Sequence, residues 1–188
     1  FTTSLIYTAS SLNIHELENM VPLLKELGVD RFFIQVIGFR GKAAKTEAST
    51  TDNKIKPVSR SEWLAIIPRV AQKVAKLGIT SIYPKVYLDL GEPFACAGLV
   101  AENYFIFPNG RVYRCPLCED YPIHSLEFND NQLAPTAKLN ENDFFQLDIP
   151  EGCVMNKLIQ PQNLSYTPQG VPRYKVGCCL LKEEIKGV

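Results

Sequence analysis

The sequence predicts an α/β fold in its first half and a small cysteine-bearing domain in its second half. Up to about residue 90, short apolar runs alternate with amphipathic helical patterns, which is typical of parallel strands joined by helices. All six cysteines lie beyond residue 95, and a strong hairpin signal, Asn109-Gly110, lies among them. We therefore expect two domains, residues 1–90 and residues 91–188.

The first domain opens with a strand and a helix. Residues 2–8 form an apolar, β-branched run that predicts a buried strand. Asn13 and Glu16 predict a capping box at the start of a helix that ends at Gly28. Pro22 lies inside this helix and predicts a kink.

Two further strands and a second helix complete the first half. Residues 31–37 and 81–88 predict strands, and Pro84 either weakens the second prediction or places that strand at an edge. Ser59 and Glu62 predict the capping box of a helix that ends at Gly78. The polar stretch from Gly38 to about Pro57 predicts a long loop that is either functional or mobile.

Polar residues gather at the predicted carboxyl ends of the strands. In parallel sheets joined by helices, active sites lie at this edge. The candidates here are Thr8, Ser10, Gln35 and Arg40, with Gly38 beside them. A purely structural role, as a loop cap or an internally bonded polar group, is the other interpretation of each.

The cysteines around the predicted hairpin suggest a metal centre. Cys96 precedes the hairpin and Cys115 ends its second strand, so folding the hairpin brings the two thiols toward one point. Cys118 follows in Cys115-Pro-Leu-Cys118, and a Cys-x-x-Cys turn can bind one metal through both sulfurs. Such clustering favours metal or cluster ligands over a disulfide framework.

The remaining cysteines leave the fourth ligand open between Cys153 and Cys178. Cys153 lies in a loop-rich stretch, in Pro-Glu-Gly-Cys. Cys178 and Cys179 precede Leu-Leu-Lys-Glu-Glu-Ile, which predicts a short final helix, and a helix N-terminus suits a thiolate ligand. Adjacent residues normally point apart, so one of Cys178 and Cys179 is expected to be a packing thiol.

The spacing of Cys96, thirteen residues, Gly110, four residues and Cys115 fits C-x9–15-G-x4-C. This pattern resembles the opening of the SPASM/twitch auxiliary-cluster domain of radical S-adenosylmethionine enzymes. The first half resembles the last three strands of that family's partial (β/α)6 barrel, and Gly38-Phe-Arg-Gly-Lys-Ala resembles a turn found after its fifth strand. The resemblance implies the C-terminal half of such a barrel over 1–90, followed by a twitch-like hairpin, loop and helix domain over 91–188.

The resemblance also implies cofactors. One auxiliary 4Fe–4S cluster would be held by Cys96, Cys115, Cys118 and either Cys153 or Cys178, because six cysteines cannot supply the eight ligands of two all-cysteine clusters. Thr8, Ser10, Gln35 and Arg40 would contribute to binding S-adenosylmethionine. The family's C-x3-C-x2-C and the later C-x2-C-x5-C-x3-C are not found in this sequence. We therefore expect a fragment that cannot cleave S-adenosylmethionine alone, from a cytoplasmic oxidoreductase acting on a peptide or a small molecule.

Two other interpretations stay open. Zinc accepts four thiolates equally well, so the second half could be a structural zinc module with no redox role. A secreted domain with disulfides would also use an even number of cysteines.

Composition and charge limit the classes of binding partner that the chain is expected to have. The 188 residues carry 20 Lys+Arg and 20 Asp+Glu, so no basic footprint for nucleic acid is present. No apolar run approaches the roughly 20 residues of a membrane span, and no membrane contact is expected. The unpaired edge of the first strand, residues 2–8, predicts pairing with earlier strands of a longer chain or, without them, self-association.

Overall fold

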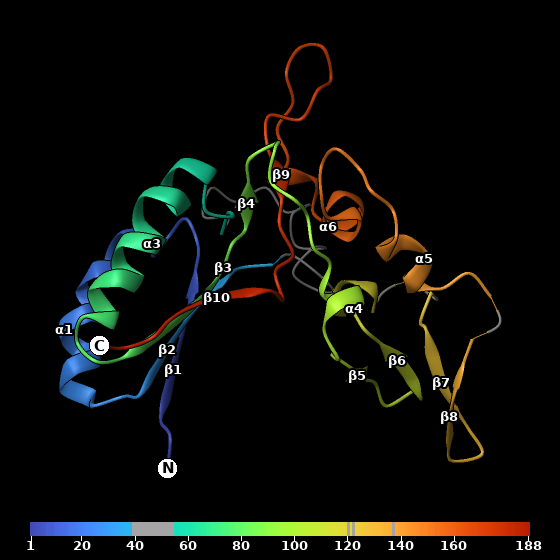
Figure 1. The fold of residues 1–188 in the computed structure, drawn as a ribbon, viewed down its shortest axis with the longest axis horizontal. Coiled ribbons are helices and arrows are strands. Elements are labelled where there is room, and N and C mark those ends of the chain that lie inside the picture. Colours follow the sequence, from blue (N-terminus) through green and yellow to red (C-terminus); the bar gives the residue numbers. More distant parts are fainter. Residues whose placement is uncertain (39–54, 120, 122, 137) are drawn as a thin grey trace. The chain divides into compact units, whose positions relative to one another are not determined.

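The computed structural model describes residues 1–38, 55–119, 121, 123–136 and 138–188 (Figure 1). Their described parts form two compact units. Unit 1 contains residues 1–38, 55–87 and 179–188, and unit 2 contains residues 88–178. The chain enters unit 2 after Tyr87, close to the predicted boundary at residue 90, but its last ten residues belong to unit 1.

Unit 1 is built on a four-stranded sheet in the order β1-β2-β3-β10. The first three strands run parallel and β10 runs antiparallel to β3. Their bounds are β1 Ser4–Ala9, β2 Arg31–Val36, β3 Thr80–Pro84 and β10 Lys182–Ile185. The predicted parallel pairing of the first three strands is confirmed, and β1 is an edge strand.

Two helical segments connect the parallel strands and pack on one face of the sheet (Figure 1). A 3₁₀ helix η1 (Ile14–Asn19) leads into α1 (Met20–Leu27), and α3 spans Arg60–Ala75. In β2, Phe32 and Ile34 are fully buried whereas Gln35 is exposed, which identifies the helix-facing side. The helices contribute the rest of the core from residues that are almost inaccessible: Ile14, Leu17, Leu24, Trp63, Ile67, Val70, Ala71 and Val74.

The predicted start of the first helix was partly wrong. Asn13 does not cap it, because its side chain is bound elsewhere. The Asn13 Oδ1 accepts from the backbone N–H of Ser10 at 2.8 Å, and its Nδ2 donates to the Thr8 carbonyl at 3.0 Å. Pro22 falls in the first turn of α1, where a missing N–H breaks no intrahelical bond. The predicted end at Gly28 is confirmed, with φ of 61°.

The second capping box is confirmed. The Glu62 backbone N–H donates to Ser59 Oγ at 3.3 Å, and Ser59 N–H donates to Glu62 Oε2 at 3.2 Å. Of the two alternatives for Pro84, the edge position was wrong, because β3 lies between β2 and β10, whereas the predicted strand 81–88 is interrupted after Pro84. Pro84 is tolerated because pairing with β2 ends at Ile82, so no ladder bond toward β2 is lost.

The predicted final helix was also wrong. Residues Lys182–Ile185 form strand β10, which pairs with β3 from Lys182 opposite Pro84 to Ile185 opposite Ser81. A free edge on β3 offers backbone partners to this segment, and such tertiary pairing outweighs a weak local preference for helix.

Unit 2 contains an antiparallel sheet in the order β5-β6-β7-β8 and several short helices. The strands are β5 Phe105–Ile106, β6 Arg111–Tyr113, β7 Leu126–Asn129 and β8 Gln132–Pro135. The helices are α4 Ala97–Val100, η3 Pro116–Cys118, α5 Glu141–Phe145, α6 Val154–Ile159 and η4 Pro161–Asn163. Two short strands, β4 Tyr87–Leu88 and β9 Lys175–Val176, precede and follow these elements.

The predicted hairpin is confirmed, but its turn differs from the expected two-residue form. The Gly110 N–H donates to the Phe107 carbonyl at 3.0 Å, so the turn spans Phe107 to Gly110 with Pro108 at its second position. Gly110 has φ of 81°, whereas Asn109 is not in the left-handed region. The hairpin between β7 and β8, with positive φ at Asp130 and Asn131, lies in a stretch expected to be loop.

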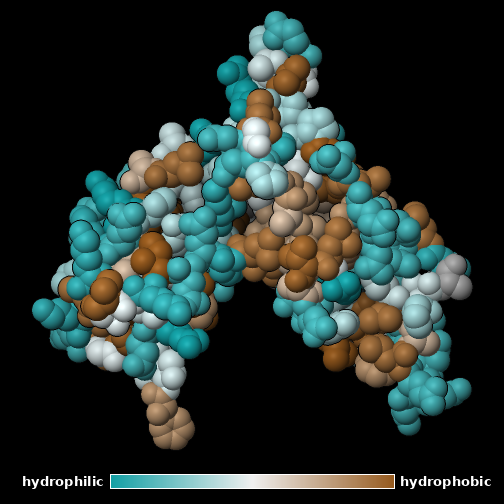
Figure 2. Space-filling model, in the orientation of Figure 1, coloured by the Kyte–Doolittle hydropathy of each residue, from teal (hydrophilic) through white to brown (hydrophobic). Residues whose placement is uncertain are grey.

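One face of the unit 2 sheet is apolar and partly open. Ile106, Val112, Leu126 and Pro135 stand opposite one another across the four strands, and Phe128 and Leu133 continue the same face. Figure 2 shows hydrophobic atoms at the surface over β5 and β6. In the part of the chain that the structure describes, no helix has the length and hydrophobicity needed to cross a membrane.

Candidate metal centre

The turn after β6 carries two buried cysteines. Cys115 precedes η3 and Cys118 ends it, with the Cys118 backbone N–H donating to the Cys115 carbonyl at 3.1 Å. Pro116 fits the first position of this short helix, where no N–H is needed. Cys118 is completely buried and Cys115 nearly so. Their thiols are hydrogen-bonded to each other, so the turn directs both sulfurs to one place.

Its surroundings keep the Cys118 thiol protonated. The hydrogen bond that the Cys118 thiol donates to Cys115, burial, and the negative charges of Cys115 and Glu141 raise the pKa of Cys118 far above its usual range. A nearby cation reverses this effect, since a thiol that coordinates a metal is deprotonated. The pair is therefore suited to losing its protons when a positively charged group binds.

Cys96 is brought to the same buried cluster by α4. It lies at the N-cap of α4 and packs against a group of buried residues that includes Cys115, Cys118 and Cys153. Burial raises the pKa of Cys96 to about 11, the N–H groups of Gly98 and Leu99 lower it, and the charges of Cys178 and Cys115 raise it. Cys96 therefore interacts with both the hairpin cysteine and the cysteine that follows β9.

Close packing holds α4 in place. A Cβ atom on Gly98 would overlap the ring of Phe145 in α5, so only glycine allows this approach. Because Gly98 is two residues from Cys96, the contact between α4 and α5 also positions that thiol.

Cys178 and Cys153 approach the cluster in different ways. Cys178 interacts electrostatically with Cys96. Cys153 is buried in the cluster and caps α6, because its Sγ accepts from the Asn156 N–H at 3.3 Å. The Cys153 N–H also donates to the Val176 carbonyl at 3.1 Å, which ties it to the strand before Cys178. Cys179 falls in unit 1, whereas the five other cysteines fall in unit 2.

All six cysteines are described and each has a free thiol, so none is paired in a disulfide. Among the residues that the structure describes, no three or more His, Cys, Asp or Glu side chains form a group that could hold a metal ion. Cys115 and Cys118 are hydrogen-bonded to each other, and Cys96 interacts electrostatically with Cys115 and Cys178.

Glu141 is a buried carboxylate beside this cluster that the sequence did not indicate. It is fully buried at the start of α5, and its oxygens accept from the backbone N–H groups of Arg114 and Cys115. Asn140 and Asp143 form a capping box around it. A glutamate in a first helical turn is ordinarily solvated, so no local pattern distinguishes it.

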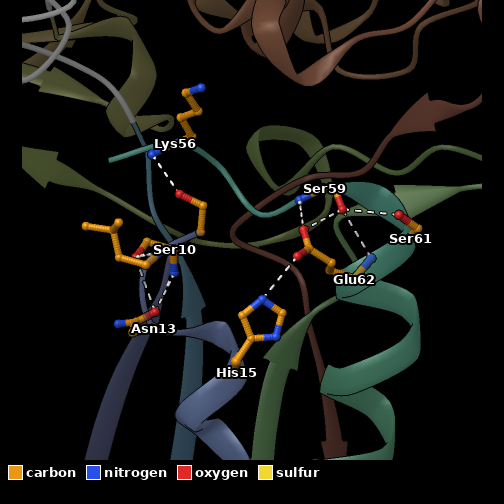
Figure 3. Close-up of polar contacts among 9 residues, drawn as sticks. Ser10, Asn13, His15, Lys56, Ser59, Ser61 and Glu62 are labelled. Atoms are coloured by element: carbon orange, nitrogen blue, oxygen red, sulfur yellow. Dashed lines mark hydrogen bonds and ion pairs between the residues drawn. The ribbon is translucent and has the colours of Figure 1, made fainter. Parts of the chain in front are cut away.

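The second group of candidates lies in unit 1. Thr8 and Gln35 are directly opposite each other in the pairing of β1 with β2, and both are exposed. Ser10 is buried, and its hydroxyl donates to Asn13 Oδ1 at 3.2 Å (Figure 3). Arg40, with the Gly-Arg-type turn around it, lies outside the described residues.

Figure 3 shows that the polar residues that follow β1 interact with one another and with residues at the start of α3. The Lys56 N–H donates to Ser11 Oγ at 3.1 Å, and His15 Nε2 lies 3.5 Å from Glu62 Oε1. Of the candidates at the carboxyl end of the strands, Thr8 and Gln35 lie side by side, and Ser10 is hydrogen-bonded to the nearby Asn13.

Comparison with protein-family models found no matching family, and searches of curated proteins and of solved structures found no match either.

Proposed function

We propose that this chain is part of a radical S-adenosylmethionine oxidoreductase and that unit 2 binds one auxiliary 4Fe–4S cluster. The ligands would be Cys96, Cys115, Cys118 and Cys178. The supporting observation is that Cys96, Cys115 and Cys118 meet in one buried cluster of unit 2, and that Cys178 interacts electrostatically with Cys96. When bound, such a cluster supplies electron transfer or an anchor for substrate.

The donor set fits this group. Iron–sulfur clusters are held by thiolates, and here every proposed ligand is a cysteine with a free thiol. Burial raises the pKa of Cys96, and the hydrogen bond to Cys115 together with burial raises that of Cys118; neighbouring thiolate charges add to both shifts. Cationic iron would offset this cost on binding. Since the described side chains do not form a group that could already hold a metal ion, we expect cluster binding to rearrange the four thiols.

Cys178 is preferred to Cys153 as the fourth ligand. Cys178 interacts with Cys96, whereas the sulfur of Cys153 accepts from the Asn156 N–H in the first turn of α6. Removing Cys153 from that position would leave a helical N–H without its acceptor, at a cost typical of a lost cap.

In unit 1, Thr8 and Gln35 are proposed to contribute to binding S-adenosylmethionine, together with Arg40. Their shared exposed face at the carboxyl end of β1 and β2 supports the assignment of Thr8 and Gln35. Ser10 would act through the turn that it stabilises with Asn13.

Anaerobic reconstitution of the chain with iron and sulfide tests the proposal. We expect about four iron and four sulfide ions per chain and a brown protein with visible absorbance. A colourless chain that instead retains stoichiometric zinc would support a structural zinc module. Thiol counting under denaturing conditions should find all six thiols free, and fewer would support the disulfide alternative.

A further inference from the structure

Glu141 connects α5 to the turn that carries two of the proposed ligands. One of its oxygens accepts from the Arg114 N–H and from the Ser125 hydroxyl, the latter at 2.8 Å. The other accepts from the Cys115 N–H at 3.1 Å. The thiol of Cys118 is also hydrogen-bonded to this carboxylate.

Burying the Glu141 carboxylate costs free energy, and hydrogen bonds from the Cys115–Cys118 turn offset part of that cost. A buried carboxylate loses its hydration, and only hydrogen bonds from the protein offset that loss. Three of the four donors belong to residues 114–118, which form the Cys-x-x-Cys turn and its entry.

We propose that Glu141 is a positioning residue for the cluster site: it fixes the Cys115–Cys118 turn and places one negative charge beside the cluster. This inference rests on the proposed function. Fixing the backbone of the turn in advance lowers the entropic cost of binding, although the thiol side chains still rearrange. The charge disfavours the reduced cluster, which is one electron more negative, so it holds the reduction potential down.

The test compares Glu141→Gln with Glu151→Gln in the 188-residue chain. Glu151 is the matched control because it is a buried glutamate of the same unit, bonded to Lys157 at 2.6 Å and Tyr166 at 2.9 Å. After anaerobic reconstitution, we expect E141Q to bind at least twofold less iron than the unsubstituted chain. The cluster that remains should have a more positive midpoint potential in a dye-mediated titration, whereas E151Q should change neither value.

Alkylation of the metal-free chain separates this inference from the proposed function. Mass spectrometry of iodoacetamide-treated, folded protein should show Cys115 and Cys118 reacting several-fold faster in E141Q, with Cys153 unchanged. If the unsubstituted chain binds no iron–sulfur cluster, the proposed function fails and with it this role for Glu141, even where alkylation shows a fixed turn. Full iron occupancy with an unchanged potential in E141Q overturns the role of Glu141 alone.

A second, more conservative variant keeps the test possible if Glu141→Gln prevents folding. If circular dichroism shows that E141Q is unfolded, Glu141→Asp carries the test, since it keeps the charge but is too short to reach every donor. We expect faster alkylation of Cys115 and Cys118 and reduced iron in E141D, with a potential close to that of the unsubstituted chain. Unchanged alkylation and iron content in E141D would refute the positioning role.

Discussion

The Tyr83 hydroxyl donates a hydrogen bond to the Glu183 carboxylate at 2.9 Å, joining β3 to β10. The two residues are direct partners in the strand pairing. Burial, together with the hydrogen bond and the charge of Glu183, raises the pKa of Tyr83 to about 12. The bond therefore holds the last strand of unit 1 to the sheet as long as the phenol keeps its proton.

Tyr83→Phe should weaken unit 1 at neutral pH and remove part of its sensitivity to alkali. The raised pKa means that the tyrosine's contribution is complete below about pH 10, the value for the unfolded chain, and is lost as pH rises through about 12. Loss of a hydrogen bond to a charged group costs about 2 kcal/mol at pH 7. Urea unfolding at pH 7 and pH 11.5 measures this difference, which should shrink at the higher pH. Tyr104→Phe, at an exposed tyrosine, is the control, and an equal loss at both pH values would contradict the assignment.

Cys96→Ala and Cys179→Ala should separate a ligand from a packing thiol. Cys96 packs in the buried cluster of unit 2, whereas Cys179 belongs to unit 1. We expect Cys96→Ala to lose most of the bound iron and to lower the thermal stability of the reconstituted chain, because binding energy at such sites is folding energy. Iron analysis and thermal melting measure both effects. A full cluster in Cys96→Ala together with an empty Cys179→Ala would exclude the proposed ligand set.

Gly98→Ala should destabilise unit 2 and impair the cluster site. The added methyl group overlaps the Phe145 ring, and overpacking of this kind costs about 1–3 kcal/mol. Denaturant unfolding should show this loss, and reconstitution should show less iron because α4 carries Cys96 at its start. Gly91→Ala is the matched control, since a Cβ there meets nothing within 4 Å. Equal stability of the two variants would show that the α4–α5 contact does not position the thiol.

Ile6→Lys should reduce self-association of the chain. Ile6 is 59 % exposed on β1, whose outer edge has no strand partner among the described residues. Exposed apolar edge strands pair with other chains, and a lysine on the strand opposes this. Sedimentation velocity at increasing concentration should show association that Ile6→Lys lowers at least several-fold. Leu12→Lys, at an exposed leucine outside the strands, should leave it unchanged.

Local patterns predicted the elements whose information lies in neighbouring residues. The strands β1 and β2, the Ser59–Glu62 capping box and the Gly110 hairpin all follow from short-range periodicity, capping and turn chemistry. The same reasoning failed at Asn13, because its side-chain amide bonds to Ser10 and Thr8 and does not cap the helix. A capping residue is predictable only where no tertiary or turn partner competes for it.

Long-range contacts account for what the sequence did not reveal. The segment Lys182–Ile185 is a strand because it pairs with the edge of β3. The sequence of the segment itself gives no sign of this distant partner. The importance of Gly98 depends on Phe145, and that of Glu141 depends on donors 16 to 27 residues away. The hairpin did predict the neighbourhood of Cys96, Cys115 and Cys118, since a hairpin fixes which distant residues meet.

The pairing of β3 with β10 joins residues 100 positions apart, with all of unit 2 between them. During synthesis, one edge of β3 therefore stays uncovered until residues 182–185 have left the ribosome. Closing so long a loop costs conformational entropy and slows folding. Cys96 and Cys178 lie near the two ends of unit 2, so a cluster bound by both would cross-link that loop near its base. Loading the cofactor early would then speed the closure of the first sheet, and a cofactor-free chain would expose β3 to misassembly for longer.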